Sequence, residues 1–119
     1  MGAQAVRLHW APLRGRQCLL IVFYGRLTTD EAVRGGDQMK AEVEASDEPV
    51  TIVWDCREMT NYSARAFVAW KTRLGAIAGQ VDLIRCVSTS SFIKLGASAL
   101  GLAIGKSIKT VASLEALDF

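Results

Sequence analysis

Apolar and polar positions alternate with two different periods along this chain, and the two periods predict strands and helices. Near the N-terminus Val6, Leu8 and Trp10 alternate with Arg7 and His9, which is typical of a strand with one wet face. Three mainly apolar runs predict further strands, at residues 18–24, 50–54 and 83–87, and residues 107–111 predict a last short strand. The strand at 18–24 is apolar throughout, so we expect it to be covered on both faces.

Three segments between these strands carry apolar residues at steps of three and four, the period of an amphipathic helix. Thr28 and Glu31 have the spacing of a capping box, so the first helix begins there, weakened by the Gly35-Gly36 pair. A second helix begins at Ser63, after a strand that ends at Asp55 and a polar turn. Its apolar face is at positions 67, 70, 74, 77 and 81. A third helix covers 92–104, and residues 114–117 add a terminal helical turn.

The order of these elements predicts the fold class. Strands that alternate with helices favour a largely parallel sheet with right-handed crossovers, and Pro12 with Gly15 marks a hairpin between the first two strands. We therefore expect an α/β fold: a mixed, mostly parallel sheet of about five strands with an N-terminal antiparallel hairpin and helices packed on the sheet. With 119 residues, half of them apolar, the chain predicts one domain over 1–119.

Composition and charge narrow the class of protein. A net charge of +2 without a dense basic block argues against nucleic-acid binding. The three cysteines lack Cys-x-x-Cys spacing, which favours reduced thiols and a cytoplasmic protein. The N-terminus has no apolar stretch of secretory length, and the most apolar run, 95–105, is too short to cross a bilayer. The sequence therefore predicts no membrane span and no nucleic-acid partner.

Residues that carry catalysis are scarce. His9 is the one histidine, and we expect it to face solvent beside Arg7. Cys56 lies between Asp55 and Arg57, and a close Arg57 would lower the pKa of the thiol and make it reactive. We favour the simpler interpretation of Cys56 as a structural cysteine at a strand end. The acidic residues lack metal-ligand spacing, so we predict no catalytic residue, no metal and no cofactor.

Three segments carry a family resemblance: GRLTTDEAV at 25–33, IVWDCREMTNYSARAF at 52–67 and IKTVASLEAL at 108–117. They are similar in order and spacing to segments of the STAS domains, the anti-sigma-factor antagonist fold, and resemble most closely the SpoIIAA-like branch of small stand-alone proteins. The resemblance implies a non-enzymatic regulatory or protein-interaction domain. It also implies a protein partner such as a regulatory kinase or another sigma-pathway protein.

The resemblance draws attention to the corner between the third strand and the second helix. In regulatory STAS proteins this corner carries an Asp-Ser pair whose Ser is phosphorylated. An ungapped match puts Ser63 at the Asp position and Ala64 at the phosphoacceptor position, whereas a one-residue shift makes Ser63 the acceptor. From the residues alone, Ser63 is first of all a helix N-cap. We predict partner recognition at residues 59–65, and the candidate residues are Asp55, Met59, Asn61, Tyr62, Ser63 and Arg65.

The third helix is apolar on all sides, and such a helix needs cover on more than one side. A small sheet covers one side. The other cover is a second subunit in a homodimer, a small apolar, lipid-like ligand between this helix and the sheet, a membrane surface, or the chain's own hairpin or C-terminal turn. Small residues at 96, 97, 101 and 105 allow close backbone approach there. The candidate interface or ligand-binding residues are Phe92, Ile93, Leu100 and Ile104.

Overall fold

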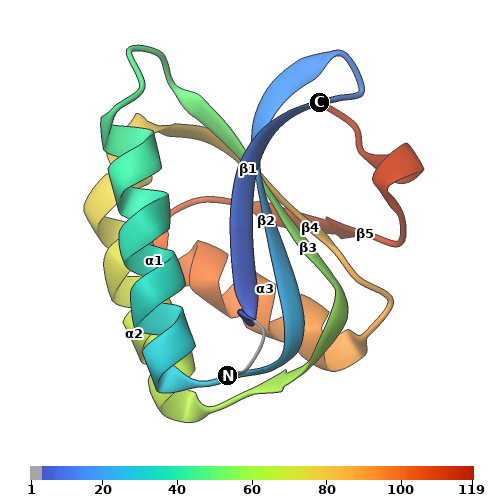
Figure 1. The fold of residues 1–119 in the computed structure, drawn as a ribbon. Coiled ribbons are helices and arrows are strands. Elements are labelled where there is room, and N and C mark those ends of the chain that lie inside the picture. Colours follow the sequence, from blue (N-terminus) through green and yellow to red (C-terminus); the bar gives the residue numbers. More distant parts are fainter. Residues whose placement is uncertain (1–3) are drawn as a thin grey trace.

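The computed structural model describes residues 4–119, and its elements follow the predicted order (Figure 1). Two short 3₁₀ turns, η1 (Ala78–Gln80) and η2 (Leu114–Ala116), accompany the regular elements. The strands are β1 (Val6–Leu13), β2 (Arg16–Leu27), β3 (Val50–Tyr62), β4 (Val81–Val87) and β5 (Ile108–Val111). The helices are α1 (Thr29–Glu44), α2 (Ala64–Ile77) and α3 (Ser91–Ile104).

The strands form one five-stranded sheet in the order β1-β2-β3-β4-β5. β1 pairs with β2 in antiparallel fashion, and the other pairs are parallel. The predicted hairpin and mixed sheet are therefore confirmed. Each new strand is added on the same side of the previous one, so right-handed crossovers place all the connecting helices on one face. Figure 1 shows α1 and α2 side by side on that face, with α3 behind the strands β1 and β2 in this view.

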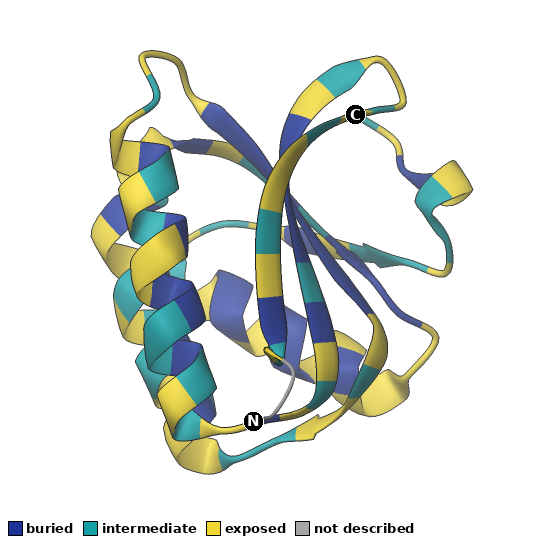
Figure 2. Cartoon of the chain, viewed as in Figure 1, coloured by how far each residue is buried: buried dark blue, intermediate teal, exposed yellow. Residues whose placement is uncertain are grey.

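The main core lies between the sheet and this helical layer. Figure 2 shows the buried residues of the helices along the side that faces the sheet. This core joins Ile52 and Trp54 of β3 to Trp70 and Leu74 of α2, and it reaches Met39 of α1. A smaller core covers part of the opposite face. Its buried members come from the strands and the C-terminal segment: Cys18, Leu20, Val53, Val87 and Leu117.

The strand that we expected to be covered on both faces, β2, has cover on both faces only in its first half. Leu117 packs over Cys18 and Leu20, but the second half of the same face has no such cover, and Tyr24 is 40% exposed.

His9 is exposed on β1, as expected. Trp10 is also partly exposed and donates an Nε1 hydrogen bond to Glu42 of α1 at 2.9 Å.

Two predicted boundaries are wrong. The third strand does not end at Asp55, because β3 continues to pair with β2 as far as Leu27 and Tyr62. The polar residues after Asp55 look like a turn in the sequence, but their backbone is held by this ladder, which shifts register around Gly25. Gly25 adopts a positive φ of 64°, which glycine tolerates without strain. The second helix ends at Ile77, and Val81 begins β4.

The capping box at the start of α1 forms only in part. Thr28 Oγ1 accepts a hydrogen bond from the Glu31 backbone N–H at 3.3 Å, as the motif requires. The Glu31 carboxylate accepts instead from the Ala5 backbone N–H at 2.5 Å and from Arg34 Nε at 2.7 Å. Arg34 also donates to the Val6 carbonyl at 2.6 Å. These bonds attach the first turns of α1 to the edge strand β1.

Gly35 offers a test of this close α1–β1 packing. A Cβ added at Gly35 would lie 2.7 Å from Val6 Cγ1 and 2.9 Å from Val6 Cβ, and Val6 is fully buried. We expect Gly35→Ala to lower the free energy of unfolding by about 1–3 kcal/mol, in spite of the better helix propensity of alanine. Urea denaturation with Gly79→Ala as the control measures this, since nothing lies within 4 Å of a Cβ there. Equal midpoints for the two variants would contradict the packing argument.

Candidate functional site

An aromatic stack joins three elements at the corner that the sequence singled out. Tyr62, the last residue of β3, lies between Phe67 of α2 and Phe92 of α3. The ring centroids are 5.9 Å apart for Tyr62 and Phe67, and 4.7 Å apart for Tyr62 and Phe92, and both pairs are stacked. Stacked rings at these distances attract one another beyond their area burial. The stack therefore closes the gap between α2 and α3.

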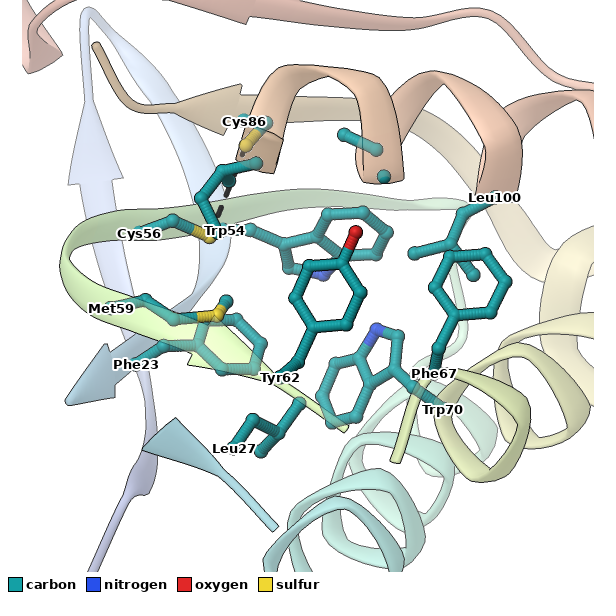
Figure 3. Close-up of a pocket in the computed structure, with 13 residues that line it drawn as sticks. Phe23, Leu27, Trp54, Cys56, Met59, Tyr62, Phe67, Trp70, Cys86 and Leu100 are labelled. Atoms are coloured by element: carbon teal, nitrogen blue, oxygen red, sulfur yellow. Dashed lines mark hydrogen bonds between the residues drawn. The ribbon is translucent and has the colours of Figure 1, made fainter. Parts of the chain in front are cut away.

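A small cavity of about 50 Å³ lies behind Tyr62, between α3 and the sheet (Figure 3). This is the place where the sequence predicted a site for an apolar ligand. Pockets that hold drug-sized molecules span about 300–1,000 Å³, so the cavity in this form is too small for a lipid. The lining residues are Phe23, Leu27, Trp54, Cys56, Met59, Tyr62, Phe67, Trp70, Cys86, Ile93, Gly96, Ala97 and Leu100.

The Trp54 indole is the polar exception in this lining. Its ring is 3% exposed and packs edge-on against Trp70, with centroids 6.2 Å apart. Among residues 4–119, no acceptor lies within hydrogen-bond reach of Trp54 Nε1. Figure 3 shows this nitrogen on the edge of the ring that turns toward Tyr62 and Trp70. A buried donor without a partner costs about 1–3 kcal/mol, so this group calls for a physical explanation.

Gly96 determines how closely Tyr62 approaches α3. A Cβ on Gly96 would overlap the Tyr62 hydroxyl and lie 3.0 Å from Tyr62 Cζ. The small residues of the third helix were expected to allow another group to approach closely. At Gly96 the group that approaches is the Tyr62 side chain of the same chain. Burial raises the pKa of the Tyr62 phenol, so the hydroxyl stays protonated at neutral pH.

The predicted site residues fall into separate groups. Met59 and Tyr62 line the cavity, and Asn61 and Arg65 are exposed beside it. Ser63 is the N-cap of α2, and its Oγ accepts a hydrogen bond from the Ala66 backbone N–H at 3.0 Å. These five residues do share one corner, as the sequence indicated.

Asp55 lies apart from the cavity. Side chains alternate across a strand, so Asp55 is on the sheet face opposite Trp54 and Cys56. Its carboxylate accepts hydrogen bonds from Arg57 Nε at 2.9 Å and Arg57 Nη2 at 2.8 Å. Burial alone would raise the pKa of Asp55, but the bonds from the Arg57 guanidinium and backbone N–H outweigh it and lower the pKa. Asp55 therefore stays ionised and holds Arg57.

Cys56 has no activating cation, because the Arg57 guanidinium is engaged by Asp55. Its sulfur lies 3.9 Å from the sulfur of Cys86, and both residues are buried. The contact with Cys86, burial and the nearby Asp55 carboxylate all raise the pKa of Cys56. The thiol form therefore dominates at neutral pH, and a thiol is a poor nucleophile. Within residues 4–119, no three potential ligand side chains gather to hold a metal ion.

The apolar character of α3 is divided between two sides. Ile93 and Leu100 are buried against the sheet, and Ile104 is half-buried. Phe92, Leu95 and Leu102 point outward and are 50%, 71% and 86% exposed. The C-terminal turn covers the other face of the sheet, so it does not shield this side. No helix in the described part of the chain is long and apolar enough to span a membrane.

The charged residues within α2 and α3 all have one sign. Neither α2 nor α3 contains an acidic residue, whereas Arg65, Lys71, Arg73 and Lys94 are cationic. Arg73 is turned toward α1 and paired with Asp37 at 2.9 Å, so it does not face α3. The contrast with α1 is clear, since α1 carries several carboxylates, two of them in its first turn. The exposed side of α3 is therefore an apolar surface with cationic neighbours.

The Asp55–Arg57 pair should make stability depend on pH in one direction. The pKa of Asp55 is lowered in the folded protein, so its stabilisation is present above the ordinary unfolded pKa of about 3.9 and is lost as pH falls through the folded value. We expect Asp55→Asn to be less stable than wild type at neutral pH, with the difference shrinking in acid. Urea midpoints measured across pH test this, with Asp47→Asn in an exposed loop as the control. A constant difference at all pH values would be evidence against it.

Ser63 can be tested as a cap separately from any modification. Ser63→Ala removes the acceptor for the Ala66 N–H and should destabilise the protein by about 1 kcal/mol, whereas Ser63→Asp should keep most of the cap. Thermal unfolding of the two variants measures the difference. Equal losses in both variants would show that the hydroxyl does not act through capping.

Comparisons with known proteins give the fold. No protein-family model matches the chain, and no curated protein matches it. One solved structure is an uncharacterized protein of the DUF3478 family from Shewanella loihica PV-4, described as having a SpoIIAA-like fold. It matches with a TM-score of 0.73 at 10% sequence identity, over 97% of this chain and 92% of that chain. The chain therefore has a SpoIIAA-like fold.

Proposed function

We propose that this protein is a non-enzymatic STAS-type interaction domain that docks a regulatory protein partner on the exposed side of α3. The observation that carries the proposal is a row of exposed apolar residues: Phe92, Leu95, Ala99 and Leu102. Steps of three, four and three place them along one side of the helix. We call this row the α3 stripe. A row of this spacing is the anchor pattern by which helices bind hydrophobic grooves.

The aromatic corner extends the α3 stripe toward α2. Phe92 is half-exposed and stacks on Tyr62, so the predicted recognition corner at residues 59–65 and the stripe form one continuous surface. Aromatic anchors beside aliphatic residues are the usual centre of a protein interface. This supports a single docking surface that includes the corner, rather than a site at the corner alone.

The charges on α2 and α3 indicate the chemistry of the partner. Arg65 and Lys94 are exposed beside the stripe, and neither helix offers an acidic residue to neutralise them. A second copy of this chain would bring cations against cations, which disfavours a homodimer through this surface. We therefore infer a different protein with an apolar surface edged by carboxylates. Three buried free thiols support a reducing, cytoplasmic setting for this encounter.

The proposal predicts that a negative charge introduced into the α3 stripe weakens docking strongly. Leu95 and Leu102 are so exposed that Leu95→Glu and Leu102→Glu should fold normally. In affinity capture from the source organism, a partner held by wild type should fall by about tenfold or more with either variant, as expected for loss of an interface anchor. The matched control is Ala41→Glu on the exposed side of α1. The purified partner should then bind wild type and Ala41→Glu more tightly than Leu95→Glu and Leu102→Glu, and it should bind wild type more weakly at higher salt.

Three outcomes contradict the proposal. The same proteins captured by wild type and by all variants would show that the stripe is not the docking surface. A concentration-dependent dimer that Leu95→Glu disperses would assign the surface to a second copy. Binding to anionic lipid vesicles that Leu95→Glu abolishes, with no protein captured, would assign it to a membrane.

A further inference from the structure

We propose that the cavity behind Tyr62 binds an apolar molecule of about the size of one ring that carries one hydrogen-bond acceptor. Trp54 Nε1–H donates a hydrogen bond to that acceptor, and the Tyr62 side chain moves aside as a gate to admit the molecule. The proposal does not rest on partner docking on the α3 stripe, although Tyr62 contributes to both sites. It starts from the unpaired Trp54 donor, which is buried and turned into the lining of the cavity.

The lining defines the chemical class of the ligand. The indole Nε1–H donates and cannot accept, so the ligand has to supply an acceptor atom such as a carbonyl, ether or ring nitrogen. None of the lining residues is charged. A carboxylate or phosphate buried there would lose its hydration without a compensating cation, which excludes anionic ligands. The aromatic and sulfur-containing side chains around the donor suit an uncharged, mainly apolar ring.

A bound water is a poor hydrogen-bond partner for the unpaired Trp54 donor. A buried water needs two to four polar partners, and cavities with apolar walls stay dry. Around this cavity only the Trp54 N–H and the Tyr62 hydroxyl are strongly polar, which is the lower end of that range, and the thiols of Cys56 and Cys86 are weakly polar. An apolar molecule with a single acceptor satisfies Trp54 without bringing further polar groups into the cavity.

The size of the ligand follows from the gate. A cavity of about 50 Å³ is smaller than the roughly 150 Å³ that holds benzene, so binding requires the site to enlarge. Tyr62 is one of three half-buried residues in the lining, with Met59 and Phe67, so it lies on the side where the cavity meets the surface. Its ring is held by stacking on Phe67 and Phe92 and by contact with Gly96. No hydrogen bond to another described residue holds its hydroxyl. If the Tyr62 ring turns outward, it leaves a space of about the size of one aromatic ring beside Trp54.

Two probes of matched shape test the donor. Acetophenone and ethylbenzene share the ring and differ in the carbonyl acceptor. We expect acetophenone to move the Trp54 Nε1–H resonance downfield in a ¹H–¹⁵N spectrum and to bind about fivefold more tightly than ethylbenzene. The Trp10 resonance is the internal control, because its Nε1–H is already bonded to Glu42 at 2.9 Å. Trp54→Phe should abolish the preference and leave the two probes with equal affinity.

The gate is tested with Tyr62→Ala, which should raise the affinity of both probes by roughly tenfold, because the open form no longer has to be populated at a cost. Gly96→Ala should act in the same direction by displacing the Tyr62 hydroxyl. Tyr24→Ala, on the opposite face of the sheet, should change neither affinity.

The proposal fails if neither probe binds wild type or folded Tyr62→Ala. It also fails if both probes bind equally to wild type while the Trp54 resonance stays in place. Leu95→Glu should leave probe binding unchanged, so failure of the docking proposal would not affect this test, and the reverse holds as well.

Discussion

The structure depends on the way its sheet grows. Every strand after β2 is added on the same side of its predecessor, so right-handed crossovers place all three helices on one face. The helices then form a row in which α3 comes last, against the short strand β5. The last helix of such a row has the sheet below it and a neighbour on one side alone. Its exposed apolar stripe is therefore a consequence of topology as well as of sequence.

The spacing within this row creates the cavity. α1 packs closely on α2, with Gly36 lying against Arg73, whereas α2 and α3 touch far less. The gap between α2 and α3 is filled from below by Tyr62, which reaches it because β3 continues seven residues beyond Asp55. One aromatic ring does not fill the gap completely, and Trp54 is left with its donor turned into the remaining space. The same extension of β3 thus makes both the aromatic corner and the cavity.

The order and type of the elements could be predicted because each carries its own periodic pattern. The length of β3 could not, since residues 57–61 are mostly polar and exposed and their strand conformation comes from backbone pairing with β2. For the candidate site, the sequence indicated the corner that carries the aromatic stack and the cavity, and it included Tyr62, but it missed Trp54, Leu95 and Leu102. In the sequence Trp54 is simply one residue of a buried strand, and no local pattern indicates whether its indole N–H has a hydrogen-bond acceptor in the folded protein. Which side of an apolar helix stays exposed is likewise decided by neighbours distant in the sequence.

Tyr62 connects the two surfaces that we propose to be functional. It stacks on Phe92, which belongs to the α3 stripe, and it closes the cavity that contains the Trp54 donor. A molecule that binds in the cavity and turns Tyr62 outward removes the partner ring of Phe92 and changes the surface offered to a docked protein. By linkage, a protein that holds Phe92 and Tyr62 together must weaken binding in the cavity by the same factor. Coupling of this kind needs no phosphorylated residue, which suits a chain with Ala64 at the position that an ungapped match assigns to the phosphoacceptor.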